Sequence, residues 1–236
     1  MLRNLTTLHG CRLATSEGDL GHVVDFYFDD KTWVVRYLVA ETGSWLTGRL
    51  VLLSPHSFGR FDQVEGKAMI INLTRQQIEN SPPIDSHRPV SRQYEAAYYR
   101  YYGWPAYWEG GAMWGLGGYP VAMQPTREEL KANQQLHHRD DKHLRSARAI
   151  TGYHIQTVDG TIGHATGLMV DDRSWAIRKL VVKTGHWYSG REILIAPANI
   201  ERISYEESKV FVNLTKEDIQ ETPENKVAKV GAVATS

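Results

Sequence analysis

The sequence predicts a mainly β protein made of two small β-barrels, joined by a partly helical connector that is rich in aromatic residues. Three observations predict this architecture: an internal repeat, short strand-like runs between glycine turns in each copy, and a dense aromatic stretch between the copies. The chain has 236 residues, of which 42% are hydrophobic and 23% charged, as in an ordinary globular protein. This length suffices for one large domain or two small ones.

The internal repeat is the strongest organising signal. Residues 10–58 align with 152–200 at a constant offset of 142, and 18 of the 49 aligned positions are identical. The identities include turn glycines, a pair of adjacent aspartates and two tryptophans in each copy. One residue then drops out near position 60, after which 72–74 matches 213–215 with the same Asn-Leu-Thr sequence. This pattern predicts a duplication.

Each copy contains the turn, strand-end and helix-start signals of a small β domain. Gly18 and Gly160 mark hairpin turns, because glycine accepts the positive φ that such turns need. A later strand in the first copy stops at Pro55, which cannot donate a hydrogen bond to a sheet. Thr74 and Thr215 each precede a polar residue by three positions, which predicts the N-cap of a short helix. Five or six short strands in roughly 75 residues predict a closed barrel.

The segment between the copies has a different composition. Residues 94–119 contain 10 of the chain's 24 aromatic residues, which is too many for a solvated linker. We expect one to two helical turns over 92–102, ended by Gly103 and Pro105, and a second helix from Thr126 to about residue 138. The preferred interpretation is packing between barrels or subunits, and the alternative is stacking on a planar ligand.

Domain boundaries follow from the repeat and the connector. We place a first barrel domain, an aromatic-rich connector, a second barrel domain and a flexible C-terminal tail at residues 1–83, 84–147, 148–224 and 225–236.

The repeated motifs resemble a known family. The pattern consists of Asp-Gly-x-Ile-Gly-His at 159–164, Asp-Asp-x-x-Trp-x-Ile-Arg-x-Leu-Val-Val at 171–182, Thr-Gly-x-Trp-x-x-Gly-Arg at 184–191 and Leu-Ile-x-Pro at 194–197. It resembles the PRC-barrel family, which is similar to the cytoplasmic domain of the photosynthetic reaction centre H subunit and to the C-terminal domain of the ribosome maturation factor. The resemblance implies two tandem PRC-type β-barrels. It also implies an interaction and adaptor module without a family active site.

Charge and cysteine content narrow the class of protein. The chain has 27 basic and 27 acidic residues, so non-specific binding to nucleic acid through phosphate neutralisation is disfavoured. The single cysteine, Cys11, excludes an internal disulfide framework and a Cys-rich zinc site. The sequence shows neither a signal peptide nor an apolar run long enough to span a bilayer, which favours a cytoplasmic protein.

Motifs for catalysis and metal binding are missing from the sequence. Nucleophile-elbow, P-loop, dinucleotide-binding, His-Glu-x-x-His and Cys-x-x-Cys patterns do not occur, so we expect a non-enzyme without a cofactor or metal. The densest imidazole and carboxylate cluster, 137–143, is interpreted as a solvated connector. The aspartate pairs at 29–30 and 171–172 are interpreted as turn caps or salt bridges.

The candidate interaction surface consists of the matched Trp and Arg loops and the connector aromatics. Its residues are Trp45, Arg49, Trp187, Arg191, Tyr102, Trp104 and Trp108. Trp and Arg are enriched among interface hot spots, although a Trp between two glycines can also close one end of its own barrel. The predicted function is a protein–protein interaction module with an unidentified protein partner, in a homodimer. The alternative is a small-molecule- or metal-binding protein that uses the connector, and an enzyme ranks third.

Overall fold

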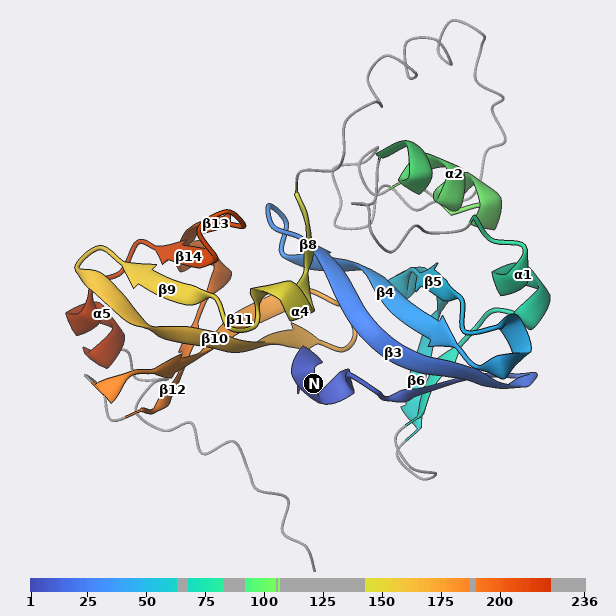
Figure 1. Cartoon of the computed structure of the whole chain (residues 1–236), viewed down its shortest axis with the longest axis horizontal. Helices are drawn as coiled ribbons and strands as arrows, with labels where there is room; N and C mark the ends of the chain where they lie inside the picture. The colour runs from blue at the N-terminus through green and yellow to red at the C-terminus, as the bar shows by residue number, and fades with distance from the viewer. Residues whose placement is uncertain (63–67, 83–91, 105, 107–142, 187–189, 222–236) are drawn as a thin grey trace, which may run out of the picture. The chain divides into compact units, whose positions relative to one another are not determined.

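The computed structural model describes residues 1–62, 68–82, 92–104, 106, 143–186 and 190–221. The chain forms two compact units, shown in Figure 1. Unit 1 contains Met1–Leu8 together with Arg145–Ser236, and unit 2 contains His9–Leu144. The eight N-terminal residues therefore belong to the unit that the C-terminal part of the chain forms.

Unit 2 is built on one twisted sheet. Its strands are β2 (Arg12–Thr15), β3 (Gly18–Asp29), β4 (Val34–Thr42), β5 (Leu50–Leu53), β6 (Phe58–Asp62) and β7 (Ala68–Ile71). They lie in the order β5-β4-β3-β2-β7-β6, with β8 (Leu144–Ser146) pairing with β3. Only the β2–β7 pair on this path is parallel. Its short helices are η2 (Ser44–Leu46), η3 (Pro55–Ser57) and α1 (Arg75–Glu79), and α2 (Arg92–Tyr102) follows.

Unit 1 has a sheet with the corresponding order of strands. Its strands are β1 (Leu2–Asn4), β9 (His154–Thr157), β10 (Gly160–Asp171), β11 (Ile177–Thr184), β12 (Glu192–Ile195), β13 (Ile200–Ser204) and β14 (Lys209–Val212). They lie in the order β12-β11-β10-β9-β14-β13, and β1 pairs with β10. The helices of this unit are η1 (Leu5–Leu8), α4 (Ala147–Ile150), η5 (Pro197–Asn199) and α5 (Lys216–Glu221).

The predicted mainly β class is confirmed, with seven strands in each of two sheets among the described residues. The pairings run as open paths from β5 to β6 and from β12 to β13. Closure of each barrel therefore stays a prediction, and so does the duplication inferred from the sequence.

Two repeated glycines permit the tight packing of the long strands. Gly21 and Gly163 have φ of 135° and 158°, and each lies at an irregularity in strand pairing. A Cβ at Gly21 would overlap the backbone carbonyl of Glu41 on β4, and one at Gly163 would overlap that of Lys183 on β11. Glycine is therefore required at both positions, which explains why the repeat retains it.

The short helices after the last strand of each unit begin as the sequence predicts. The Thr74 hydroxyl accepts a 3.1 Å hydrogen bond from the Gln77 backbone N–H, and Gln77 Oε1 accepts one of 2.9 Å from the Thr74 N–H. This reciprocal pair is a capping box at the start of α1. Thr215 and Asp218 make the same two bonds before α5.

The connector contributes a helix to unit 2. The helix expected over 92–102 is confirmed as α2, but its 11 residues make about three turns rather than one to two. The helix expected from Thr126 lies outside the described residues. None of the helices in the described part of the chain is long and apolar enough to cross a membrane.

Candidate functional site

Helix α2 presents one face to the sheet of unit 2. Glu95, Tyr98, Tyr99 and Tyr102 follow the i, i+3, i+4, i+7 spacing that lines one side of a helix. The first three are buried, with exposed fractions of 0%, 0% and 1%. Tyr98 and Tyr99 pack in one hydrophobic cluster with Tyr37, Val39 and Leu52 from β4 and β5. Burial of this aromatic face fixes the start of the connector on the sheet.

Two buried tyrosine hydroxyls, those of Tyr37 and Tyr98, form specific hydrogen bonds beneath α2. The Tyr37 hydroxyl donates a 2.8 Å hydrogen bond to Glu95 Oε1. The Tyr98 hydroxyl accepts a 2.9 Å bond from the Ser54 backbone N–H and donates one of 3.0 Å to the Leu52 carbonyl. The helix thus completes backbone hydrogen bonding at the end of β5. Because a buried polar group without a partner is costly, these bonds favour a single docked position of α2.

Two predicted site residues, Tyr102 and Trp104, come together at the end of α2. Their rings stack with centroids 4.6 Å apart and an interplanar angle of 12°. The ring of His56 continues the stack on Trp104 at 5.4 Å and 30°. Tyr101, which is 40% exposed, lies beside Tyr102 and donates a 2.9 Å hydrogen bond to the Gln77 carbonyl of α1. We call Tyr101, Tyr102, Trp104 and His56 the aromatic surface.

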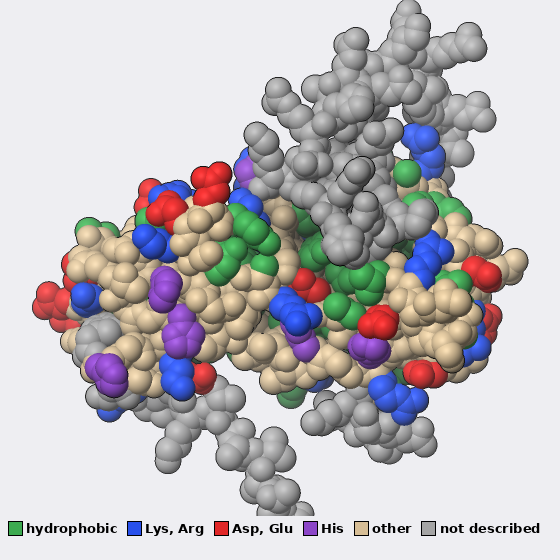
Figure 2. Space-filling view, in the orientation of Figure 1, with side chains coloured by type: hydrophobic (Ala, Val, Ile, Leu, Met, Phe, Trp, Pro, Cys, Tyr) green, Lys and Arg blue, Asp and Glu red, His purple; other side chains and the backbone are tan. Residues whose placement is uncertain are grey.

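The surroundings change the acidity of these rings. Burial raises the pKa of Tyr99 and of Tyr102 to about 12, so both phenols keep their protons at neutral pH. Partial burial, with the positive charge of Arg36, lowers the pKa of His56. The imidazole is therefore biased towards its neutral form. Figure 2 shows hydrophobic side chains gathered on unit 2 over β4.

The first Trp–Arg loop makes contacts within unit 2. The Trp45 indole N–H donates a 2.9 Å hydrogen bond to the Leu20 carbonyl, and the Arg75 guanidinium carbon lies 5.3 Å from the indole ring centre. Arg49 donates from its two terminal nitrogens to the carbonyls of Glu79 and Ser81, at 2.9 and 2.7 Å. Arg49 therefore caps the C-terminal end of α1, and Trp45 holds the loop against the start of β3. A role of these residues in an interface stays a prediction.

The other predicted site residues are placed only in part. Arg191 directly precedes β12 in unit 1 and is exposed, whereas Trp187 and Trp108 lie outside the described residues. The structure therefore brings Trp45 and Arg49 into one loop and Tyr102 and Trp104 into one stack.

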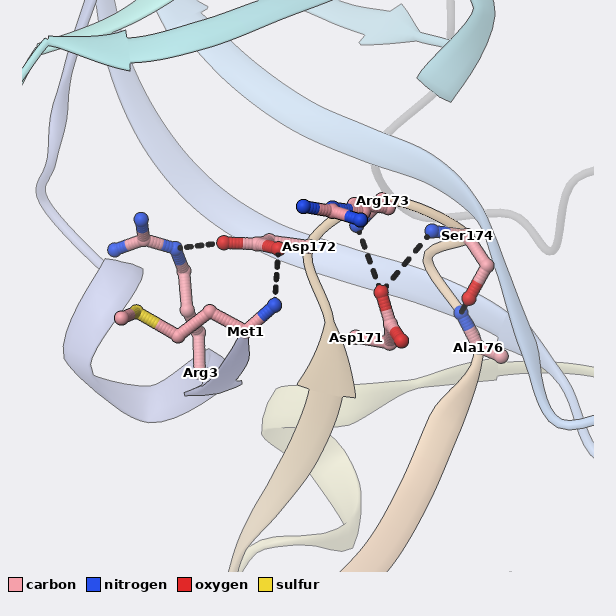
Figure 3. Close-up of polar contacts among 7 residues, drawn as sticks. All are labelled: Met1, Arg3, Asp171, Asp172, Arg173, Ser174 and Ala176. Carbon is pink, nitrogen blue, oxygen red and sulfur yellow. Dashed lines mark hydrogen bonds and ion pairs between the residues drawn. The ribbon is translucent and has the colours of Figure 1, made fainter.

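The aspartate pairs combine the two roles that the sequence analysis gives as alternatives: the first aspartate of each pair caps a turn, and the second forms an ion pair. Asp29 Oδ1 accepts hydrogen bonds from the backbone N–H groups of Lys31 and Thr32. Asp171 Oδ1 accepts the equivalent pair from Arg173 and Ser174, drawn in Figure 3. These backbone bonds lower the pKa of Asp171.

No group of three or more His, Cys, Asp or Glu side chains in the described ranges is arranged to hold a metal ion. Of the sequence cluster 137–143, only His143 is described, and its Nδ1 lies 2.9 Å from Asp30 Oδ1. A hollow of about 380 Å³ lies beside α1, lined by residues such as Ser16, Ile71 and Gln77. The Gln77 side-chain oxygen in its lining already accepts a hydrogen bond in the capping box.

Sequence analysis missed the polar anchor of α2, namely Tyr37, Ser54 and Glu95. A signal was present in the comparison of the two copies. Tyr37 belongs to the hydrophobic cluster that α2 packs into, and Leu50 packs against that cluster. At the offset of 142, these two residues align with Lys179 and Glu192. The loss of apolar character at these two positions marks the face that α2 covers in unit 2.

The comparison with protein families agrees with this architecture. Residues 3–78 match the PRC-barrel domain model. The chain contains a PRC-barrel domain. The matched PRC-barrel residues include all of β1 to β7 except Leu2, as well as the Trp45 and Arg49 loop. No curated protein gives a significant match to the chain.

Proposed function

We propose that the protein is a non-enzymatic interaction module, an adaptor that holds a protein partner and is similar in kind to the soluble domain of the reaction centre H subunit. The aromatic surface carries this proposal. It joins one exposed tyrosine, Tyr101, to the half-buried pair Tyr102 and Trp104 on a helix that is anchored to the PRC-barrel sheet. Aromatic side chains are enriched at the centres of protein interfaces, because they contribute large contact areas for little loss of side-chain entropy.

The proposal extends to the second half of the chain. Residues 148–224 form a second PRC-type domain in this scheme, so the module has two tandem copies. The 18 identities between 10–58 and 152–200 support this, as does the matching order of strands in the two units. A homodimer is part of the same proposal.

The experiment is a cross-linked affinity capture from native cells, with full-length protein as bait and the captured proteins identified by mass. Tyr101→Ala tests the aromatic surface, and Tyr205→Ala is the matched control because Tyr205 is an exposed tyrosine of unit 1. We expect one partner at stoichiometric yield from wild type and control, with at least about a tenfold loss for Tyr101→Ala. Equal capture by all three baits would exclude the aromatic surface, and capture of the bait protein alone would contradict the adaptor function.

A second candidate function is binding of a small planar molecule at the connector. The nearly parallel rings of Tyr102 and Trp104, with His56 also stacked on Trp104, have the geometry that a further planar ring could extend. Native mass spectrometry of freshly purified protein tests this candidate. An additional mass that Trp104→Leu removes would favour it over the adaptor function, and the bare chain mass would reject it.

A further inference from the structure

The N-terminal strand of the matched PRC-barrel domain does not pair with the rest of that domain. The family match begins at residue 3, and residues 9–78 of it lie in unit 2, but Met1–Leu8 belong to unit 1. There β1 pairs with β10 in antiparallel register, with Leu2 opposite Asp171, Arg3 opposite Val170 and Asn4 opposite Met169. The segment is therefore a strand added to the sheet formed by residues from the C-terminal half.

Charge and burial hold this segment on unit 1. Asp172 accepts a 3.0 Å hydrogen bond from Arg3 Nε and one of 2.8 Å from the amine of Met1, as Figure 3 shows. The Asp172 backbone N–H also donates to the Met1 carbonyl at 3.0 Å. Behind the strand, Leu5 and Leu8 of η1 are 1% and 7% exposed. Ion pairs and a buried apolar turn thus act together along one short segment.

Gly167 on β10 makes room for the segment. A Cβ built on Gly167 would lie 2.5 Å from Asn4 Oδ1 and 2.6 Å from Thr6 Oγ1, well inside van der Waals contact. Those two atoms cannot move away freely. Asn4 Oδ1 accepts hydrogen bonds from the Thr6 N–H and hydroxyl, and Thr6 Oγ1 lies 3.2 Å from the Thr166 carbonyl. The missing side chain at Gly167 is therefore part of the fit.

The equivalent segment of the second copy pairs with the sheet of unit 2. At the offset of 142, Leu2-Arg3 corresponds to Leu144-Arg145, and β8 pairs with β3 as β1 pairs with β10. Within unit 2, the Asp30 N–H donates to the His143 carbonyl at 2.9 Å, the counterpart of the bond from Asp172 to Met1. The position that corresponds to Gly167 on β3 is Asp25, whose side chain is largely buried. At this equivalent position, β3 therefore carries a carboxylate whereas β10 has no side chain.

We infer that the two PRC-type sheets exchange their N-terminal strands, and that Gly167 and Asp25 determine which strand each sheet accepts. The β10 site binds one extended peptide, the segment Leu2–Leu8, through β-pairing, the Asp172–Arg3 ion pair and the space above Gly167. Asp25 excludes this segment from β3, because a side chain there would occupy the place that Asn4 and Thr6 need. This inference does not depend on the adaptor function.

The test is amide hydrogen exchange on the full-length protein. Gly167→Ala introduces the methyl group that should displace the segment. We expect exchange over residues 2–8 and along the β1-facing part of β10 to accelerate by about tenfold or more, while β2 and β7 of unit 2 keep wild-type rates. Gly43→Ala is the matched control, because a Cβ at Gly43 would meet its nearest atom only at 4.0 Å and its φ is −63°.

A double-mutant cycle distinguishes a steric clash with the N-terminal segment from a general destabilisation of unit 1. Asn4→Ala with Thr6→Ala removes the atoms that the new methyl group would strike. In that background Gly167→Ala should change exchange over residues 2–8 by less than about threefold. An unchanged tenfold effect in that background would overturn the assignment of Gly167. Loss of amide protection in β2 and β7 would also overturn the assignment, because it would show that the segment stabilises unit 2.

Discussion

The Tyr37 hydroxyl donates a 2.8 Å hydrogen bond to Glu95 Oε1, joining a sheet residue to a helix residue 58 positions later in the chain. Both side chains are fully buried, Tyr37 on β4 and Glu95 on α2. The bond lies beneath the ring cluster that carries the aromatic surface, so it links the PRC-barrel sheet to the part of the connector proposed to bind a partner.

Replacement of Tyr37 by phenylalanine should loosen this link. Tyr37→Phe keeps the ring but removes a donor from a buried carboxylate, so we expect the free energy of unfolding to fall by about 1–3 kcal/mol. Urea unfolding followed by tryptophan fluorescence measures the change. Tyr205→Phe, at an exposed position, is the control and should stay within about 0.5 kcal/mol of wild type. Equal stability of the two variants would contradict the structural role of the Tyr37–Glu95 bond.

Trp45 should contribute to stability through its indole N–H. Trp45→Phe removes the donor to the Leu20 carbonyl and is expected to cost about 1 kcal/mol, and Trp45→Ala should cost more because the ring also lies against Arg75. Thermal unfolding compares the two variants. A separate interface role predicts that Trp45→Ala combined with Trp187→Ala changes partner binding or oligomeric state in protein that remains folded. An unchanged complex would exclude that role.

Arg49 should be required for the end of α1. Arg49→Ala frees the carbonyls of Glu79 and Ser81, and we expect faster amide exchange in α1 and a loss of about 1–3 kcal/mol. Arg49→Lys should recover only part of this, because one ammonium group does not reproduce the two-pronged contact of a guanidinium. Full recovery by lysine would show that charge alone is sufficient.

Asp172 should make unit 1 sensitive to acid. Hydrogen bonds from the N-terminal amine and from Arg3 lower the pKa of its carboxyl group. The folded protein then binds fewer protons than the unfolded chain, so the stabilisation is present above the unfolded pKa of about 3.9 and is lost as pH falls through the lower folded pKa. Amide exchange of residues 2–8 between pH 5 and 2.5, corrected for intrinsic rates, should show this loss in wild type. Asp172→Asn should already exchange faster at pH 5 and respond less to acid.

His56 should contribute a second pH dependence, nearer to neutrality. Partial burial and the Arg36 charge lower its pKa, so the unfolded chain binds the proton more tightly than the folded one. Stability should therefore decrease as pH falls below about 6.5 and towards the lower folded pKa. The titration of the imidazole by NMR gives that pKa directly, and His56→Gln should remove this part of the pH dependence. A midpoint at or above 6.5 would contradict the prediction.

Local features of the fold were predictable from sequence because they depend on a few neighbouring residues. The turn glycines Gly18 and Gly160, the threonine caps of α1 and α5, and the helix over 92–102 each follow from backbone freedom, a capping pattern or helical spacing. The aspartate turns were likewise predictable, since a short carboxylate readily accepts from backbone N–H groups two and three residues later.

The candidate site could be predicted only in part. Tyr102 and Trp104 stood out by aromatic density, but their partner His56 and the buried anchor Glu95 did not, because nothing in their local sequence indicates which sheet face α2 covers. The same limit applies to the repeated arginines. Arg36 is 1% exposed and bonds Thr32, whereas Arg178 at the equivalent position is exposed. Identical residues thus have different surroundings in the two units.

The sequence by itself determined the mainly β class, the turns and the helix caps, because these arise from interactions between residues close in the chain. The tertiary structure alone decided that Arg3 pairs with Asp172, 169 residues away, and that β1 completes the sheet of unit 1. Both copies carry the same Leu-Arg pair at the start of this strand, so that local pattern fits either sheet. The choice depends on Gly167 facing Asn4 and Thr6, a steric fit that exists only once the strands are in register.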